Sequence, residues 1–193
     1  MKKTSIFTLV LIMVLTIACK NEKKETEQKA EEMTTEKEEV TSNVEVIKFA
    51  LEPKSDSNAS GTVTFTQENG FVTMVAELEG LTEGEHAIHL HEKADCSSPD
   101  GKSTGGHWNP TSQPHGKWGS PEGYHKGDIG NFTAGADGKG TITFTTDEWC
   151  IGCGDETRDI LGKGVIVHAG TDDYTTQPTG NAGGRISCAG IIK

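Results

Sequence analysis

Short runs of alternating apolar and polar residues, separated by turn-forming residues, most limit how this chain can fold. The runs "GTVTFTQ" at 61–67 and "FVTMVAEL" at 71–78 flank "ENG", a combination typical of a tight β-hairpin. Glycine supplies 24 of 193 residues and recurs with threonine and aspartate between such runs, so the sequence predicts an all-β domain. The other predicted strands are 44–51, 85–91, 140–146, 162–170 and 185–192.

The first eighteen residues are predicted to be a signal peptide. A basic start, "MKK", precedes an apolar stretch that is short for a membrane span. The stretch ends in "TIAC" and resembles a bacterial lipoprotein signal, in which Cys19 becomes the lipidated first residue. An ordinary signal peptide with an incidental cysteine is the alternative. Both readings place the protein outside the cytoplasm, where disulfides persist. The lipoprotein reading places it in the bacterial cell envelope, lipid-anchored on the periplasmic or cell-surface side.

Residues 19–43 contain the anchor cysteine and then a run rich in Glu and Lys with few apolar residues. Such a segment buries too little surface to offset its chain entropy, so it is predicted to be a solvated, flexible tether to the membrane. A fluctuating helix with Glu–Lys pairs is the alternative. The remaining residues, 44–193, suffice for one β-sandwich or barrel. The net charge of −11 argues against a nucleic-acid partner.

Three of the seven histidines lie in the stretch "HAIHLH", which begins at His86. Side chains alternate between the two faces of a strand, so His86 shares an apolar face with Ile88 and Leu90. His86 is therefore expected to be a buried, hydrogen-bonded structural residue. His89 and His91 project from the opposite face, about 7 Å apart along the backbone. Two imidazoles at this separation can converge on one metal ion.

The other four histidines lie in predicted loops or at a strand end. Irregular segments are predicted at 92–128 and at about 169–184, and a long irregular segment inside a compact domain usually serves a function. Imidazole suits copper and zinc, and a carboxylate suits zinc better than copper. The candidate ligands in these segments are His107, His115, His125 and His168, with Asp128. Together with His89 and His91 they are more ligands than one ion needs.

Residues 44–193 resemble the copper/zinc superoxide dismutases. The matching stretches are "GEHAIHLHEKADC", "GGHWNP", "PHG", "YHKGDIGN", "VIVHAGTDD" and "GNAGGRISCAGII". The resemblance implies a Greek-key β-barrel or sandwich of about eight antiparallel strands, with a long metal-binding loop and a second active-site loop. It also implies an oxidoreductase that converts superoxide to dioxygen and hydrogen peroxide. In that reaction copper cycles between two oxidation states, and zinc organises the site.

The resemblance also implies a role for each ligand by its position. The implied copper ligands are His89, His91, His107 and His168. The implied zinc ligands are His107, His115, His125 and Asp128, so His107 would bridge the two ions. Asp172 matches a carboxylate that hydrogen-bonds one histidine of each site. Arg185 matches an arginine beside copper that binds the anionic substrate.

Four cysteines remain after Cys19, and the sequence alone allows three pairings. The resemblance selects Cys96–Cys188, which would tie the ligand loop to the last strand. Cys150 and Cys153, in "WCIGC", lie outside the family's pattern. They are predicted to form a second, local disulfide in a turn, because the strand–helix context of a thioredoxin-type motif is missing. An accessory metal site or a redox role is the alternative.

Two other functions compete with the enzyme: a non-catalytic lipoprotein that buffers copper or zinc, and a zinc-only structural or adhesion domain. Loss of a copper-site histidine or of Arg185 would favour them, and all of these residues are present.

Superoxide is an anion, and at ~0.15 M salt only charges within about 8 Å act strongly on it. Lys117 and Lys126 are the candidates to attract it. The sequence leaves the oligomeric state open, with a homodimer as one option.

Overall fold

The computed structural model describes residues 43–193; the predicted signal peptide, the anchor Cys19 and nearly all of the predicted tether lie outside these residues. Eight antiparallel strands close into a barrel, which confirms the predicted fold class. The strands are β1 (Glu45–Pro53), β2 (Ser60–Glu68), β3 (Phe71–Glu79), β4 (Gly84–His91), β5 (Gly130–Ala134), β6 (Gly140–Thr146), β7 (Gly164–His168) and β8 (Arg185–Gly190). Among the described residues, no helix is long and apolar enough to cross a membrane.

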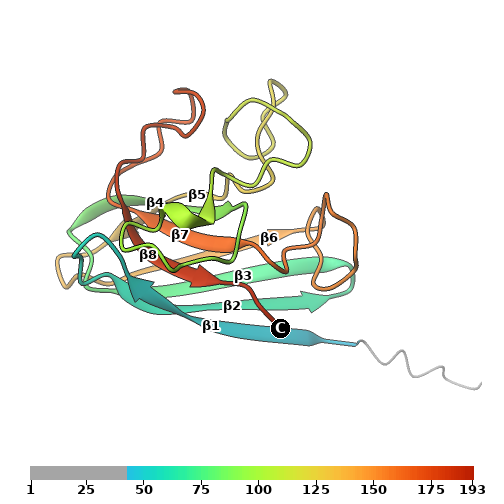
Figure 1. Ribbon diagram of the computed structural model, residues 1–193, viewed down its shortest axis with the longest axis horizontal. Helices are drawn as coiled ribbons and strands as arrows, with labels where there is room; N and C mark the ends of the chain where they lie inside the picture. Colours follow the sequence, from blue (N-terminus) through green and yellow to red (C-terminus); the bar gives the residue numbers. More distant parts are fainter. Residues whose placement is uncertain (1–42) are drawn as a thin grey trace, which may run out of the picture. The chain divides into compact units, whose positions relative to one another are not determined.

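The strand order around the barrel is β1-β2-β3-β6-β5-β4-β7-β8. Strand β3 therefore pairs with β6 instead of β4, and β4 lies between β5 and β7, as in Greek-key connections. Figure 1 shows two long irregular segments that project from the same side of the barrel, one before β5 and one between β7 and β8. This topology brings ligands from distant parts of the sequence to one side of the sheet.

The hairpin between β2 and β3 illustrates how local sequence builds the barrel. Asn69 and Gly70 adopt φ of 52° and 84°, the left-handed conformations that a tight two-residue turn requires. In β2 the side chains of Val63 and Phe65 are fully buried, while the threonines that alternate with them remain partly exposed. The period-two pattern thus places one face of each strand in the core.

One strand was missed from the sequence, and two are shorter than predicted. Strand β5 has only five residues, and only Asn131 and Thr133 are not buried, so its alternation is too brief to recognise. The strands predicted at 162–170 and 185–192 end earlier, at His168 and Gly190. The predicted irregular segment 92–128 holds only the short 3-10 helix η1 (Lys102–Thr104).

Candidate metal centre

Two clusters of buried side chains lie beside the barrel, and both contain His107. In each cluster the potential ligand atoms lie within 4.8 Å of one another. The first cluster comprises His89, His91, His107 and His168, and the second comprises His107, His115, His125 and Asp128. The structure therefore brings together all seven residues that the sequence suggested, from β4, the long loop and the end of β7.

The unsatisfied nitrogens of these clusters fit metal ions. Six buried imidazole nitrogens have no hydrogen-bond partner among the described residues: Nδ1 of His89, His115 and His125, and Nε2 of His91, His107 and His168. Buried polar atoms are normally paired, because leaving one unpaired costs about 1–3 kcal/mol. A soft or borderline metal ion is the partner that imidazole nitrogens at this spacing favour.

The hydrogen bonds on the other ring nitrogens fix which nitrogen carries a lone pair. His91 Nδ1 lies 3.0 Å from the Gly105 carbonyl oxygen, and His168 Nδ1 lies 3.3 Å from that of Gly183. A carbonyl oxygen can only accept, so both Nδ1 atoms must be N–H donors. In the neutral rings Nε2 then presents its lone pair to the cluster, as a metal ligand must.

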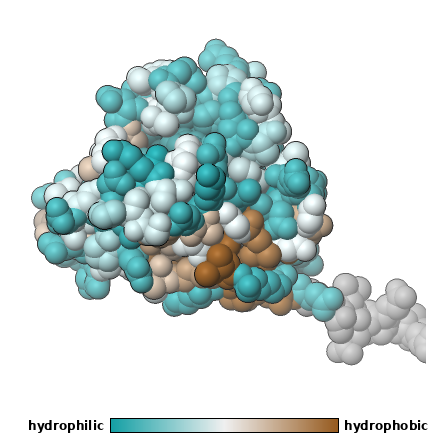
Figure 2. Space-filling view, in the orientation of Figure 1, coloured by the Kyte–Doolittle hydropathy of each residue, from teal (hydrophilic) through white to brown (hydrophobic). Residues whose placement is uncertain are grey.

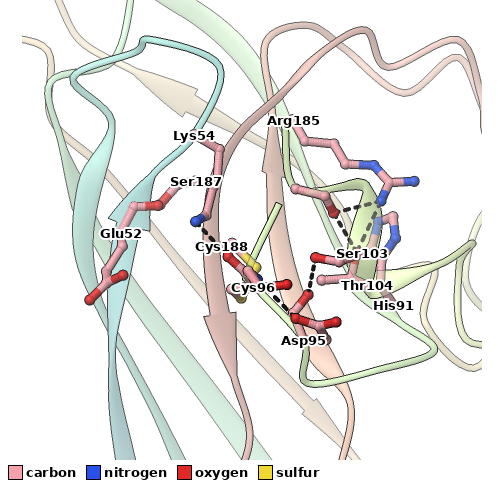
Figure 3. The surroundings of a disulfide bond; sticks show 12 residues. Glu52, Lys54, His91, Asp95, Cys96, Ser103, Thr104, Arg185, Ser187 and Cys188 are labelled. Carbon is pink, nitrogen blue, oxygen red and sulfur yellow. Dashed lines mark hydrogen bonds between the residues drawn. A yellow bond between two sulfur atoms is a disulfide. The ribbon is translucent and has the colours of Figure 1, made fainter. Parts of the chain in front are cut away.

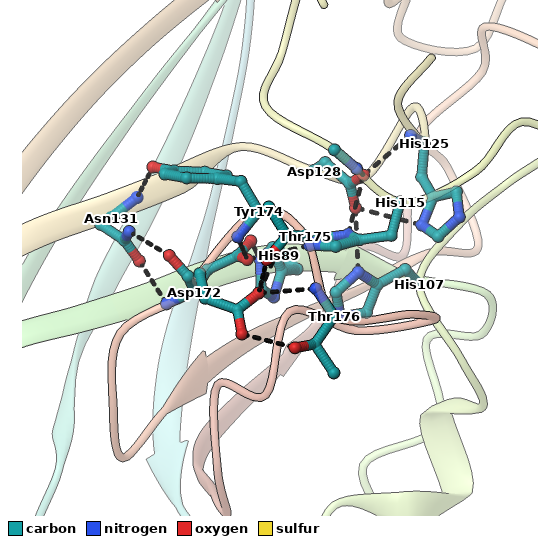
Figure 4. Close-up of polar contacts among 12 residues, drawn as sticks. His89, His107, His115, His125, Asp128, Asn131, Asp172, Tyr174, Thr175 and Thr176 are labelled. Carbon is teal, nitrogen blue, oxygen red and sulfur yellow. Dashed lines mark hydrogen bonds and ion pairs between the residues drawn. The ribbon is translucent and has the colours of Figure 1, made fainter. Parts of the chain in front are cut away.

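Asp172 joins the two clusters through their outer nitrogens (Figure 4). Its Oδ2 accepts a hydrogen bond from His89 Nε2, and its Oδ1 accepts one from His115 Nε2, both at 2.9 Å. Burial raises the pKa of Asp172, but the two histidines outweigh burial and hold it below its ordinary value. The ionised carboxylate orients one ring from each cluster and leaves both Nδ1 atoms directed inward.

Asp128 lies among three imidazoles in the second cluster (Figure 4). Its carboxylate is 2.9 Å from His107 Nδ1, 3.0 Å from His115 Nδ1 and 3.2 Å from His125 Nδ1. The last two nitrogens make no hydrogen bond with it despite the short distance, so these atoms face a common point rather than one another. His107 uses Nδ1 in this cluster, and its unpaired Nε2 is the atom it offers to the first cluster.

A bulge in the β7–β8 pair brings Arg185 next to the first cluster. The register shifts after Val167, so that His168 pairs directly with Arg185 and β8 carries one extra residue. Arg185 Nη1 donates to the Gly101 carbonyl oxygen and to Thr104 Oγ1, both at 2.9 Å (Figure 3). These bonds hold the half-buried guanidinium in one orientation.

The Cys96–Cys188 disulfide is present and attaches this part of the long loop to β8 (Figure 3). The Cys96 carbonyl oxygen also accepts a 2.6 Å hydrogen bond from Lys54 Nζ. Cys150 and Cys153 form the second, local disulfide that was predicted.

His86 is buried, as expected, and its ring bonds the backbone carbonyl oxygens of His168 and Thr82 instead of entering a cluster.

A cavity of about 330 Å³ opens onto the first cluster, and its lining includes His91, His107, His168 and Arg185. Lys102, which sequence reasoning missed, also lines it. The two lysines that were suggested to attract an anion lie elsewhere. Lys126 contacts Glu148, and Lys117 lines a different cavity beside His115. A larger hollow next to Trp108 contains no cluster residue.

Two further residues that support the site were not recognised from the sequence. Asn131 holds the backbone of Asp172 at both ends, because its side chain accepts from the Asp172 N–H and donates to the Asp172 carbonyl, each at 2.8 Å. Gly180 adopts φ of 65°, and a methyl group there would collide with the Asp172 carboxylate. Only the turn-forming sequence around Gly180 hinted at such a close approach.

The metal-free protein should become less stable as the pH falls from 7 towards 4. Burial lowers the pKa of His91 and His168, and it lowers that of His107 to about 4. In the unfolded chain these histidines bind protons near pH 6.5, whereas in the folded site they stay neutral. Each such histidine therefore lowers the free energy of unfolding by about 1.4 kcal/mol per pH unit below 6.5. Urea unfolding of chelator-treated protein at several pH values measures this slope.

His115 has the opposite sign, because although burial lowers its pKa, Asp128 and Asp172 together raise it to about 9. The stability that His115 contributes is complete below pH 6.5 and is lost only as the pH rises through 9, so His115 does not change the free energy of unfolding in the acid range.

The free energy of unfolding of a His168→Gln variant should fall less steeply with pH below 6.5, because about one proton fewer is taken up on unfolding. Equal stability of the metal-free protein at pH 7 and pH 5 would contradict this account.

Comparison with known proteins places these clusters in a family context. The sequence model of the copper/zinc superoxide dismutase family (SODC) matches residues 59–191. A "Superoxide dismutase [Cu-Zn]" from Caulobacter vibrioides is 39% identical over 148 residues, which cover 75% of this chain and 84% of the relative. A SOD-like protein from Bacillus subtilis has a similar crystal structure, with a TM-score of 0.67, 30% identity and coverage of 75% of this chain and 97% of that chain. A double mutant of that protein gives a TM-score of 0.66 at 31% identity, with coverage of 76% and 97%.

Proposed function

Because the chain belongs to the copper/zinc superoxide dismutase family, we propose that its two joined clusters are the copper and zinc sites at which superoxide is converted to dioxygen and hydrogen peroxide. The observation that carries this proposal is His107, which belongs to both clusters and offers one ring nitrogen to each. The all-nitrogen cluster suits copper, and the cluster with a carboxylate suits zinc. Copper would be held by His89, His91, His107 and His168; zinc would be held by His107, His115, His125 and Asp128.

Copper held by the first cluster would supply one-electron redox chemistry, and zinc held by the second cluster would keep its charge and supply no redox chemistry. The residues of this chain do the rest. Arg185 is fixed by Gly101 and Thr104 beside the cavity, so its free N–H groups can bind and orient the anion. His107 Nε2 is buried at the cavity wall and is the ring atom suited to hold a proton and pass it to the reduced substrate.

The test combines metal analysis with turnover. We expect one copper and one zinc ion per chain and rapid superoxide turnover by the loaded protein. An Arg185→Ala variant should keep both metals while its turnover falls, since Arg185 belongs to neither ligand cluster. Tight copper binding with no turnover by the wild-type protein would support a metal-buffering role and would exclude the enzyme.

Lys102 should contribute to substrate attraction, because it is a cation on the cavity wall although it pairs with Asp100 at 3.0 Å. A Lys102→Glu variant should lower kcat/KM about fivefold at low ionic strength. The effect should shrink at ~0.15 M salt, where the screening length is about 8 Å. Lys117→Glu makes the same charge change at the other cavity and is the matched control. Equal losses in both variants, or a loss independent of salt, would contradict a local role for Lys102.

We propose that Cys19 carries a lipid and that the charged segment after it tethers the enzyme in the bacterial cell envelope, on the periplasmic or cell-surface side. The support is the sequence alone: a short apolar stretch that ends at a cysteine, followed by a run of Glu and Lys. Mass spectrometry of the mature N-terminus should detect an acylated Cys19. A Cys19→Ala variant should leave the membrane fraction. An unmodified mature N-terminus would support an ordinary signal peptide instead.

We also propose that the domain can form a homodimer through an exposed apolar surface near the start of β1. Figure 2 shows hydrophobic surface there, close to where the described residues begin. Within residues 43–193, the exposed large apolar side chains are Val44, Val46, Phe71 and Ile192. Lys193 contacts Glu45, which brings the C-terminal end beside β1. Sedimentation of the wild type should show a concentration-dependent dimer that Val46→Glu weakens; a monomer at every concentration would exclude it.

A further inference from the structure

We propose that the Cys150–Cys153 disulfide is a second redox site, which accepts electrons from external dithiols independently of the metal centre. The bond joins residues three apart in a turn after β6. It takes no part in either ligand cluster. Its chemistry therefore has to be argued from its own surroundings.

The two cysteine residues differ in exposure. Cys153 is exposed, whereas Cys150 is 7% exposed. In the other disulfide Cys96 is only partly exposed and Cys188 is buried. Exchange requires a thiolate to reach a disulfide sulfur, so an external thiolate reaches Cys153 most readily.

The two bonds also differ in what they add to folding. Cys150–Cys153 spans a sequence separation of 3, whereas Cys96–Cys188 spans 92. A disulfide stabilises mainly by restricting the unfolded chain, and this effect grows with the length of the closed loop. Reduction of the short bond therefore loses less folding free energy, and the short bond should be reduced first.

The turn is held by hydrogen bonds that do not depend on the sulfurs. The Asp159 carboxylate accepts the N–H groups of Gly152 and Gly154, each at 2.9 Å. The backbone of Cys150 bonds to Arg158 and Ile160 at 2.9 and 3.0 Å. The two thiols should therefore remain near each other after reduction, which makes the couple reversible.

The balanced step transfers two electrons and two protons. One thiolate of the dithiol attacks Sγ of Cys153, the bond to Cys150 breaks, and the electron pair leaves on Cys150 Sγ, which takes up a proton. The second thiol of the dithiol then attacks its own sulfur in the mixed disulfide and releases Cys153 as a thiol. The dithiol becomes a disulfide. The disulfide is the electrophile in this exchange, so the Cys150–Cys153 pair acts as the electron acceptor.

The exchange should leave dismutation intact. Trp149, which precedes Cys150, is buried, and its Nε1–H donates to the Lys126 carbonyl oxygen next to His125. This contact and the Cys150 backbone bonds need no sulfur–sulfur bond. Turnover by holoprotein reduced only at Cys150–Cys153 should stay within about twofold of the oxidised form.

Holoprotein equilibrated in buffers of reduced and oxidised dithiothreitol, then alkylated and analysed by peptide mass spectrometry, tests the proposal. The Cys150–Cys153 pair should be reduced with an equilibrium constant at least tenfold larger than that of Cys96–Cys188, a difference of about 30 mV. Equal constants, or the reverse order, would overturn it. This readout does not depend on turnover, so its failure is distinct from failure of the dismutase proposal.

Matched single variants test the order of attack. Cys150→Ser leaves the Cys153 thiol, and Cys153→Ser leaves the Cys150 thiol. The Cys153 thiol should react at least tenfold faster with a small aromatic disulfide, and equal rates would overturn the assigned order. Reduction of the wild type by a reduced thioredoxin as well as by dithiothreitol would identify protein dithiols as donors, and reduction by dithiothreitol alone would identify small dithiols. Reduction by neither would overturn the proposal.

Discussion

Replacing His107 with alanine should lower superoxide turnover by the metal-loaded protein at least ~100-fold. Residues that merely orient a metal ligand typically contribute about 10- to 100-fold to affinity or activity, and His107 is itself a member of both clusters. Its loss removes one nitrogen from each cluster and the proton-holding atom at the cavity wall. Turnover measured at equal protein concentration, together with copper and zinc content, gives the result.

His86→Asn is the matched control for that variant. His86 is another buried histidine of β4, but its ring bonds backbone carbonyls and enters neither cluster. We expect this control to keep one copper and one zinc ion per chain, even where its stability falls. A His107→Ala protein with turnover within about fivefold of the wild type, at full metal content, would disprove the shared role of His107.

Removal of the Cys96–Cys188 bond by a double Cys→Ser substitution should lower the free energy of unfolding by about 4–5 kcal/mol. The bond spans a separation of 92 residues, and chain-entropy reasoning gives this magnitude for so long a loop. Turnover should fall as well, because the bond attaches to β8 the loop whose Gly101 and Thr104 hold Arg185. Urea unfolding under oxidising conditions measures the stability.

The Cys150→Ser/Cys153→Ser double variant is the control that makes the same chemical change, the loss of two sulfurs, without opening a long loop. It removes the same number of sulfurs, but the closed loop is short, so the same reasoning gives only about 2 kcal/mol. Arg185 and its partners are untouched, and turnover should not change. Equal destabilisation of the two double variants would show that loop length does not govern the contribution of these disulfides.

Most of the barrel could be predicted from local sequence. The alternation in β2 and β3 and the Asn69–Gly70 turn specify a hairpin through short-range sterics and a period of two. Strand β5 could not be recognised, because its five residues gain their pairing from β4 rather than from their own pattern. The end of β7 lies at the bulge at His168, and β8 ends at Gly190 because its partner there, Gly164, is the first residue of β7; both limits are properties of the pair and not of either strand.

The site, too, could be predicted only in part from local sequence. The alternation of "HAIHLH" was enough to separate the structural His86 from His89 and His91, because adjacent side chains on a strand must point to opposite faces. The resemblance to a known family assigned the candidate ligands to the copper or the zinc site. Lys102 and Asn131 were not recognised, and Lys126 was given a role for which its contact with Glu148 leaves it poorly placed.

The sequence by itself determined the fold class, the faces of the strands and the kinds of ligand, because these follow from residue chemistry and near-neighbour geometry. Only the tertiary structure decided which nitrogen of each imidazole is free, how Asp172 joins the two clusters, and which cation lines the cavity. Those properties depend on contacts between residues distant in the chain, such as Asp172 with His89, and no local pattern encodes such contacts.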